Sequence, residues 1–242
     1  FGEGEDEVHA FGPVDISIKS GEFVSVLGPS GCGKSTLMLM MAGLLEPTSG
    51  EIYFDDKSVK GPKNDIGIMF QDNTLVPWRT VEGNIKLQLE LRNLDISKYK
   101  DKIFNILKSV KLEDFANRYP SELSGGMQQR AAFCQAMIHE PNTILLDEPL
   151  GKLDAMTREK IRSDIQNLWM INKPTVIFVT HSIEEAVQLS SRVILISPRP
   201  GIVDREINID LPYPRDLSVK RSNKFFEYVH EIQEVFHEYG VI

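Results

Sequence analysis

The chain has 242 residues, of which 41% are hydrophobic and 26% charged, a composition typical of a globular protein that buries its core without disulfide or metal support. Its longest apolar run, Leu37 to Leu45, is far shorter than the ~20 residues of a membrane-spanning helix. With 27 Lys and Arg against 35 Asp and Glu, the net charge of −8 argues against a broad grip on nucleic acid or anionic lipid. Cys32 and Cys134 form neither a metal-ligand pattern nor a disulfide framework, which favours a reducing compartment.

Short apolar runs and stretches of helical periodicity alternate along the chain. Because the first residue is Phe1 rather than Met, we expect the chain to begin inside a longer polypeptide and a first strand to be missing. In chain order, we then expect a strand at 22–27, a glycine loop, a helix at 34–42, strand and turn material at 51–54, a mostly helical insertion at 71–142, a strand at 143–146, a helix at 156–170, a strand at 175–179, a helix at 183–190 and a strand at 192–196. Apolar strands that alternate with helices predict an α/β fold with a mainly parallel central sheet. Beside this sheet we expect a small antiparallel β subdomain and the inserted helical subdomain.

The end of the chain predicts an edge strand and a helix. Charged and apolar residues alternate over 204–210, a pattern that suits a short edge strand. The apolar residues that follow recur at helical spacing and are Phe225, Val229, Ile232, Phe236 and Tyr239. We expect this helix to cover its own domain, with contact to a partner copy as the alternative. One domain is expected over 1–242, with a core at 1–70 and 143–210, a helical subdomain at 71–142 and a helical tail at 211–242.

The segment after the first strand matches the phosphate-loop pattern G-x-x-x-x-G-K-[ST] between a predicted strand and a predicted helix. The candidate nucleotide-binding residues are Gly28, Pro29, Ser30, Gly31, Cys32, Gly33, Lys34, Ser35 and Thr36. Glycines let backbone N–H groups curl around a phosphate, and the helix N-terminus adds positive charge. We expect Lys34 to reach the β- and γ-phosphates of ATP and Ser35 to ligate Mg²⁺. Cys32 is expected to be a small tolerated side chain in preference to a redox group. The loop predicts a P-loop NTPase fold.

Two further strands end in chemically useful side chains. The run at 144–146 leads into Asp147 and Glu148, which point to opposite faces of the strand. Asp147 is therefore expected to hold Mg²⁺, and Glu148 to orient and polarise the attacking water. His181 follows the strand at 175–179 and should emerge at the carboxyl edge of the sheet, where open α/β sheets bind ligands. A lone histidine is usually structural, so spacing alone favours a structural role for His181 over a functional one.

The segment Leu123 to Arg130, read LSGGMQQR, resembles the LSGGQ signature of ABC (ATP-binding cassette) ATPases, with Met127 in place of the usual Gln. Ser124, Gly125 and Gly126 precede an alanine-rich helical stretch and form a second anion-binding helix start. One nucleotide does not need two such loops from one chain, which suggests a composite site. In this family two cassettes pack head to tail, and each signature closes on the phosphate loop of the other copy.

The resemblance covers most of the chain and implies further roles. Gln71 resembles the glutamine that contacts Mg²⁺ and relays the nucleotide state to membrane subunits, and His181 resembles the histidine that contacts the γ-phosphate. Asp154 resembles the conserved aspartate of the family's D-loop, although Lys152 replaces the usual small residue nearby. Phe1 is the candidate aromatic that stacks on adenine. The candidate catalytic residues are thus Glu148, His181 and Gln71, and the candidate metal ligands are Ser35, Gln71 and Asp147.

A finer resemblance lies in two segments, LVPWRTV at 75–81 and SPRPG at 197–201. Both are similar to segments of ATPase subunits of the nitrate, sulfonate, taurine and bicarbonate importer family. Pro77, Trp78 and Arg79 form a stiff segment with an aromatic and a cation, suited to an interface; packing of Trp78 on its own subdomain is the alternative.

These resemblances imply an ATPase bound to ATP and Mg²⁺, working as two copies with polytopic permease subunits and, indirectly, a solute-binding protein. It would be peripheral to the cytoplasmic face of the membrane and drive uptake of a small oxyanion or organic solute. An export role remains open. A DNA-maintenance ATPase is a third possibility, but such chains carry a long coiled coil between phosphate loop and signature, and no sustained heptads occur here. No nucleic-acid partner is expected. An unrelated P-loop kinase would lack the segment at 123–130.

Overall fold

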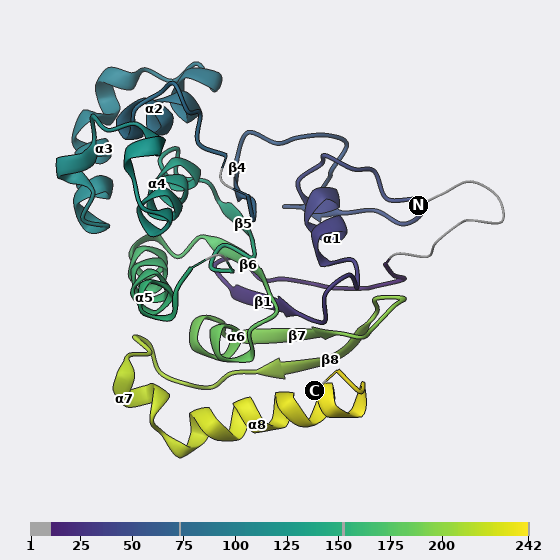
Figure 1. Cartoon of the computed structure of the whole chain (residues 1–242). Helices are drawn as coiled ribbons and strands as arrows, with labels where there is room; N and C mark the ends of the chain where they lie inside the picture. Colours follow the sequence, from purple (N-terminus) through teal and green to yellow (C-terminus); the bar gives the residue numbers. More distant parts are fainter. Residues whose placement is uncertain (1–10, 73, 152, 242) are drawn as a thin grey trace. The chain divides into compact units, whose positions relative to one another are not determined.

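The computed structural model describes residues 11–72, 74–151 and 153–241, which divide into two units. The first unit contains residues 1–63 and 175–242, and the second contains 64–174. The second unit contains more of the chain than the helical subdomain expected at 71–142, because it also includes two strands and a long helix. Figure 1 labels most elements of the two units.

The first unit is built on strands that pair in the order β6, β1, β7, β8. The strands and helices of this unit are β1 (Phe23–Leu27), α1 (Lys34–Met41), β2 (Tyr53–Phe54), β3 (Lys57–Ser58), β6 (Thr175–Thr180), α6 (Ile183–Leu189), β7 (Arg192–Ile196), β8 (Val203–Asn208), α7 (Leu217–Lys220) and α8 (Asn223–Glu238). β1 runs parallel to both β6 and β7, whereas β8 is antiparallel to β7. β2 and β3 form a small antiparallel pair. All five residues of β1 are buried, as expected for a strand with neighbours on both edges.

The C-terminal helix lies along the first unit and buries one face in it (Figure 1). Phe225, Ile232 and Phe236 of α8 are buried in a cluster with residues of α6, β7 and β8, and Val229 and Tyr239 pack against that cluster. The preferred interpretation of this helix, that it covers its own domain, is confirmed. The strand expected at 204–210 is also present, as β8, at the edge of this unit's strands.

A buried arginine ties the chain before α7 to α6. The guanidinium of Arg215 is 1% exposed and donates hydrogen bonds to the carbonyl oxygens of Val187, Ser190, Ile209 and Leu211 at 2.6–3.3 Å. Its ring neighbour is Tyr213, at 4.1 Å from the guanidinium carbon to the ring centroid. These carbonyl oxygens accept from the N–H donors of the guanidinium and so offset part of the cost of burying the cation.

The second unit is mainly helical. Its strands and longer helices are β4 (Ile66–Met69), α2 (Val81–Leu91), α3 (Lys100–Ser109), α4 (Gly125–Met137), β5 (Thr143–Asp147) and α5 (Ala155–Asn172). β4 and β5 are parallel neighbours. α4 is almost wholly buried and packs against α2, α3, α5 and β4. β4 approaches α4 closely at Gly67, where a Cβ would lie 2.4 Å from the carbonyl oxygen of Ala136. None of the described helices is long and apolar enough to cross a membrane.

Candidate active site

The phosphate loop of the first unit links the buried strand β1 to the start of α1. Gly31 and Gly33 have φ angles of 78° and 99°, a left-handed backbone that a side chain would strain. At Gly28 space is the constraint, because a Cβ there would lie 2.9 Å from the carbonyl oxygen of Ile196. The glycine pattern therefore has a backbone cause at each of these positions. Gly33 directly precedes α1, so the loop leads into the positive end of a helix.

Lys34 lies inside this loop. Its side chain is 5% exposed, and Nζ donates hydrogen bonds to the carbonyl oxygens of Gly28 and Pro29, each at 2.8 Å. The ammonium group is thus held among the loop residues, the place from which a lysine reaches bound phosphates. Ser35 is exposed in the first turn of α1 and Thr36 is half-buried.

Both cysteines are buried and unoxidised. Burial raises the pKa of the Cys32 thiol, an effect that the nearby Lys34 partly offsets. Burial also raises the pKa of Cys134 to about 12. Both groups are therefore neutral thiols at pH 7, which supports the interpretation of Cys32 as a small side chain without a redox role.

His181 comes from the strand beside the phosphate loop. β1 and β6 are parallel, and Leu27 is the register partner of Thr180. The next residues, Gly28 and His181, therefore leave the sheet at the same carboxyl edge. His181 is exposed. This strand alignment, which the sequence could not show, brings a lone histidine next to the phosphate loop within one unit.

The turn that carries His181 is held by residues that the sequence analysis missed. The Thr180 hydroxyl donates to a carboxylate oxygen of Glu185 at 2.7 Å and accepts from the N–H of Ser182 at 3.0 Å. The Ser182 side chain caps α6 by accepting from the N–H of Glu185. A signal was present, because Ser182 and Glu185 have the S-x-x-E spacing of a capping box. Here the glutamate binds Thr180 and so positions the turn.

In the second unit, β4 and β5 bring Gln71 and Glu148 together. Met69 and Leu146 are register partners in these parallel strands, and each candidate residue lies two positions further on. The Gln71 amide Nε2 donates to Oε2 of Glu148 at 3.2 Å. Glu148 has a φ of 42°, uncommon for a residue with a side chain. Asp147, at the end of β5, is 8% exposed.

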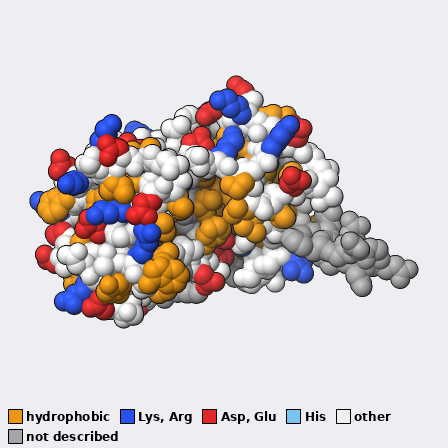
Figure 2. Space-filling view, turned by 90° about the horizontal axis from the view of Figure 1, so that it is seen from above, with side chains coloured by type: hydrophobic (Ala, Val, Ile, Leu, Met, Phe, Trp, Pro, Cys, Tyr) orange, Lys and Arg blue, Asp and Glu red, His pale blue; other side chains and the backbone are white. Residues whose placement is uncertain are grey.

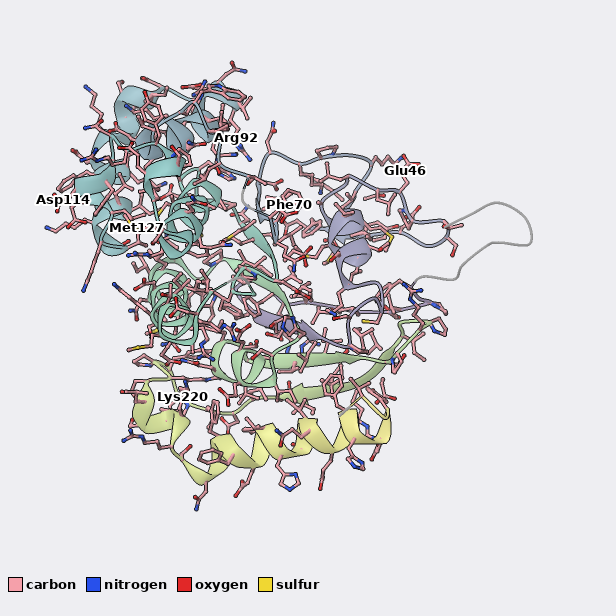
Figure 3. All side chains as sticks on the ribbon, viewed as in Figure 1. Glu46, Phe70, Arg92, Asp114, Met127 and Lys220 are labelled. Carbon is pink, nitrogen blue, oxygen red and sulfur yellow. The ribbon has the colours of Figure 1, made fainter. Side chains whose placement is uncertain are left out.

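The signature segment forms the start of α4 in the same unit. The Ser124 side chain caps the helix and accepts from the N–H of Met127, which is labelled in Figure 3. A Cβ at Gly125 would meet nothing within 4 Å, whereas a Cβ at Gly126 would lie 2.3 Å from Cγ2 of Thr157. Gly125 is thus open and Gly126 is packed against α5. The signature is a glycine-lined helix start with one accessible and one internal glycine.

Asp154 caps the helix that packs on the signature. Its Oδ1 accepts from the N–H groups of Met156 and Thr157 at 3.1 and 3.0 Å. Hydrogen bonds from the side chain and then the backbone of Thr157 lower the pKa of this carboxyl. Thr157 therefore contacts both Asp154 and Gly126, and links the D-loop candidate to the signature within one unit. Sequence spacing contains no signal for this contact.

Trp78 is presented to solvent by a braced loop. The indole is 77% exposed, so it does not pack on its own subdomain. Asn84, which is fully buried, accepts from the N–H of Val76 and donates to the carbonyl oxygens of Val76, Arg79 and Thr80 at 2.7–3.1 Å. Arg79 forms an ion pair with Glu90 at 2.7 Å. An exposed aromatic on a preorganised loop is typical of an interface.

Phe1, the candidate adenine-stacking residue, lies outside the described residues, as does Lys152. Among those that are described, no group of three or more His, Cys, Asp and Glu side chains could hold a metal ion.

The described surface and helices can be compared with those of a DNA-maintenance ATPase. On the face drawn in Figure 2, acidic and basic side chains are interspersed among apolar ones. The α-helices described between Gly28 and Ser124 are short, and the longest of them, α2, has 11 residues. No long coiled coil therefore lies in the described part of that segment.

Comparisons with known proteins found sequences similar to this chain. Residues 11–151 match the family model described as "ABC transporter". The chain is 42% identical over 230 residues to an uncharacterized ABC transporter ATP-binding protein of Methanocaldococcus jannaschii, covering 95% of this chain and 85% of that protein. It is 43% identical over 227 residues to the aliphatic sulfonates import ATP-binding protein SsuB of Bacillus cereus, covering 94% and 88%.

A solved structure is similar as well. The dimeric post-hydrolysis structure of the ATP-binding cassette MJ0796, bound to ADP and Pi, has a TM-score of 0.75 and 36% identity, covering 86% of this chain and 94% of that one. The expected P-loop α/β fold, with mainly parallel strands and a small antiparallel pair, is confirmed. The family resemblance of the signature segment is confirmed too. This chain belongs to the ABC transporter family and is one of its ATP-binding, ATP-hydrolysing subunits.

Proposed function

We propose that this chain is the motor of an importer, in which two copies bind two Mg-ATP and drive uptake of a small oxyanion or small organic solute through separate permease subunits. The observation that carries the hydrolytic part is the Leu27–Thr180 register, which sets the phosphate loop and His181 at one sheet edge. The importer part is supported by the 43% identity to the aliphatic sulfonates import protein SsuB.

In this proposal the phosphate loop binds the β- and γ-phosphates through its backbone N–H groups and Lys34. Ser35, Gln71 and Asp147 offer a hydroxyl, an amide oxygen and a carboxylate, the oxygen donors that suit Mg²⁺. When bound, Mg²⁺ neutralises charge on the β- and γ-phosphate oxygens. Asp147 is buried at the end of β5, which limits the positions that its carboxylate can take.

Glu148 acts as the general base. Its carboxylate orients the attacking water and takes up a proton, while Gln71 holds the carboxylate by the 3.2 Å hydrogen bond. His181 contacts the γ-phosphate and stabilises the charge that develops on it. The turn from Thr180 to Ser182 gives His181 a rigid base for that contact.

In this proposal the signature segment contacts the nucleotide that is bound by the other copy. Ser124, Gly125 and Gly126, with Asp154, close on the nucleotide held by the partner's phosphate loop. The exposure of Ser124 and Gly125 supports this, because a second chain has access to them. The dimeric MJ0796 cassette provides a model of such a pair. Closure of the two copies on ATP, followed by hydrolysis and release, is the motor cycle.

Permease subunits would bind at the braced loop that carries Trp78 and Arg79, and would hold the complex at the cytoplasmic face of the membrane. A solute-binding protein would deliver the cargo on the other side. Trp78 is the anchor because its large apolar surface is already exposed on a rigid loop.

The test is assembly and transport with the complete complex in proteoliposomes. Candidate binding proteins loaded with a sulfonate, nitrate or bicarbonate are added, and ATP hydrolysis and solute uptake are measured. We expect one loaded binding protein to stimulate both; ATP-driven efflux without stimulation would contradict an importer. Trp78→Ala should weaken co-purification with the permease, whereas Phe226→Ala, which truncates an exposed aromatic on α8, should not. Unaltered assembly of the Trp78 variant would rule out this interface.

A further inference from the structure

The turn between β7 and β8 lies against the phosphate loop of the first unit. The turn consists of residues 197–201, the SPRPG segment that the proposed chemistry leaves without a role. β7 is the parallel neighbour of β1, and Leu195 is the register partner of Leu27. The turn and the loop therefore follow paired strands at the same sheet edge, and side chains of one can reach the backbone of the other.

Arg199 binds the tip of the phosphate loop. Its Nε donates a hydrogen bond to the carbonyl oxygen of Gly31 at 2.7 Å. Nη2 of the same guanidinium lies 3.4 Å from the place where a Cβ at Gly31 would be. Gly31, with a φ of 78°, is one of the two loop glycines that have a left-handed backbone. The contact therefore holds the loop at a backbone position that depends on glycine.

Gly201 supports the next peptide group of the loop. It is buried, and a Cβ at this position would lie 1.9 Å from the carbonyl oxygen of Cys32. Gly201 also forms a β-bridge with Phe11, and its carbonyl oxygen accepts from the N–H of Gly12 at 2.7 Å. Any side chain at 201 would push Cys32 or the backbone of the turn, so close approach explains the glycine.

The turn is rigid enough to position another segment. The Ser197 hydroxyl accepts from the N–H of Ile202 at 3.2 Å and lies 3.1 Å from the carbonyl oxygen of Pro200. The N–H of Ser197 donates to the carbonyl oxygen of Ile202 at 3.0 Å. Two prolines, Pro198 and Pro200, further restrict the backbone. Arg199 thus projects from a fixed base.

Because the peptide bond is planar, the hydrogen bond from Arg199 also fixes the direction of an N–H group that can donate to phosphate. The carbonyl oxygen of Gly31 and the N–H of Cys32 belong to one rigid peptide unit and point in opposite directions. A guanidinium that holds the oxygen on one side therefore sets the direction of the N–H on the other. The Cys32 carbonyl oxygen and the Gly33 N–H likewise share one planar peptide unit. The close approach of Gly201 to that oxygen therefore restricts the direction of the Gly33 N–H. These N–H groups belong to the loop that cradles phosphate.

We propose that Arg199 is a positioning residue for nucleotide binding: it anchors the Gly31 carbonyl and so preorganises the N–H groups of the phosphate loop. It acts through the loop and does not contact the nucleotide. The inference rests on the proposed use of this loop for Mg-ATP. An anchored loop loses less conformational entropy on binding, so the effect belongs to affinity more than to the hydrolytic step.

The experiment compares four variants of the full chain: Arg199→Met, Arg199→Lys, the control Arg205→Met and Lys34→Ala. Arg205 is a matched arginine on β8 that pairs with Glu238 at 2.7 Å, away from the loop. The Kd for Mg-ATP is measured by calorimetry, KM and kcat by phosphate release, and the thermal unfolding midpoint without nucleotide. We expect Kd and KM of Arg199→Met to rise about fivefold, the loss of one exposed charge-assisted hydrogen bond, with kcat little changed.

Arg199→Lys keeps a donor and should recover most of the affinity, while Arg205→Met should bind Mg-ATP like the unaltered chain. The unfolding midpoint should stay the same in both Arg199 variants, because the side chain is exposed. Unchanged Mg-ATP affinity in Arg199→Met would overturn the positioning role of Arg199, and so would a loss of affinity accompanied by a lower unfolding midpoint. Neither result would contradict nucleotide binding by the phosphate loop. If the unaltered chain binds Mg-ATP no better than Lys34→Ala, the proposed function of the loop fails as well.

Discussion

Glu148 combines an unusual backbone with a specific partner. Its positive φ turns the side chain out of the strand direction, and Gln71 binds the carboxylate at 3.2 Å. Neither feature requires a negative charge on Glu148, because glutamine has nearly the same shape and also offers an oxygen to Gln71. A change to glutamine therefore removes the base and preserves the arrangement.

We accordingly expect Glu148→Gln to bind Mg-ATP with unchanged affinity and to lose ~10²-fold or more of the ATP turnover, the usual contribution of a general base. Phosphate release and nucleotide binding measure the two quantities. The trapped ATP should also hold two copies together, visible as a dimer in size-exclusion chromatography. Turnover equal to that of the unaltered chain would remove Glu148 from the role of base.

His139, which lies in the second unit, is a second residue whose surroundings change its chemistry. Burial, with a further contribution from Arg92 (labelled in Figure 3), lowers the pKa of His139 to about 4. An unfolded histidine titrates near 6.5, so between pH 6.5 and 4 the unfolded state binds more protons than the folded state. The free energy of unfolding therefore falls as the pH is lowered through this window.

Urea unfolding at pH 7 and pH 5 tests this residue. Both tryptophans of the chain, Trp78 and Trp169, lie in the second unit, so their fluorescence reports the unit that contains His139. We expect the midpoint to fall on acidification, and to fall less in His139→Gln. His230→Gln, a change at an exposed histidine of the first unit, should leave the fall unaltered. Equal falls in all three proteins would refute the assignment.

At the scale of elements, the two signature glycines have different surroundings. Gly125 begins α4 in open space, and Gly126 faces Thr157 at the start of α5. Thr157 cannot simply turn away, because its side chain also bonds to Asp154. An extra methyl at 126 therefore meets a fixed neighbour, and one at 125 meets nothing in its own chain.

Gly126→Ala should lower the free energy of unfolding by about 1–3 kcal/mol, the usual cost of overpacking. Adding Thr157→Ser to the Gly126→Ala variant removes the methyl that clashes and should restore part of the lost stability. Gly125→Ala should leave stability within ~0.5 kcal/mol of the unaltered chain but reduce ATP turnover, because a partner's nucleotide would have to fit there. Urea unfolding and phosphate release separate these effects. Full turnover in Gly125→Ala would argue against a signature that closes on nucleotide.

At the scale of the whole molecule, the proposed site is shared between two copies. Ser124→Arg should block the signature of one chain, and Lys34→Ala should disable the phosphate loop of the other. Each variant alone should lack ATPase activity, because all of its sites contain the defect. A mixture forms heterodimers in which one site combines an intact loop with an intact signature.

We expect mixing the two inactive variants to recover part of the ATPase activity, measured by phosphate release against protein concentration. Recovery should depend on dimer formation and vanish on dilution. Full activity in either variant alone would refute the shared site, and so would a mixture that stays inactive although heterodimers form.

The sequence determined the features that depend on local pattern. Apolar runs located β1, β5, β6 and β7 within a residue or two, because buried parallel strands need continuous hydrophobic segments. The phosphate loop and the signature were recognisable because glycine is required where the backbone is left-handed, as at Gly31, or closely packed, as at Gly126. Spacing also predicted the buried face of α8.

Which of these features lie next to one another follows from strand register and from contacts between distant segments, and no sequence pattern predicts it. Strand register places His181 beside the phosphate loop and Gln71 beside Glu148, although 77 residues separate the latter pair. The contact between Arg199 and Gly31 joins residues 168 positions apart in the sequence. The carbonyl oxygens that accept from the buried Arg215 are likewise not predicted by any sequence motif. Periodicity in a sequence reports which face of an element is buried; it carries no information about the neighbour that covers it, because strand pairing depends on the packing of distant segments.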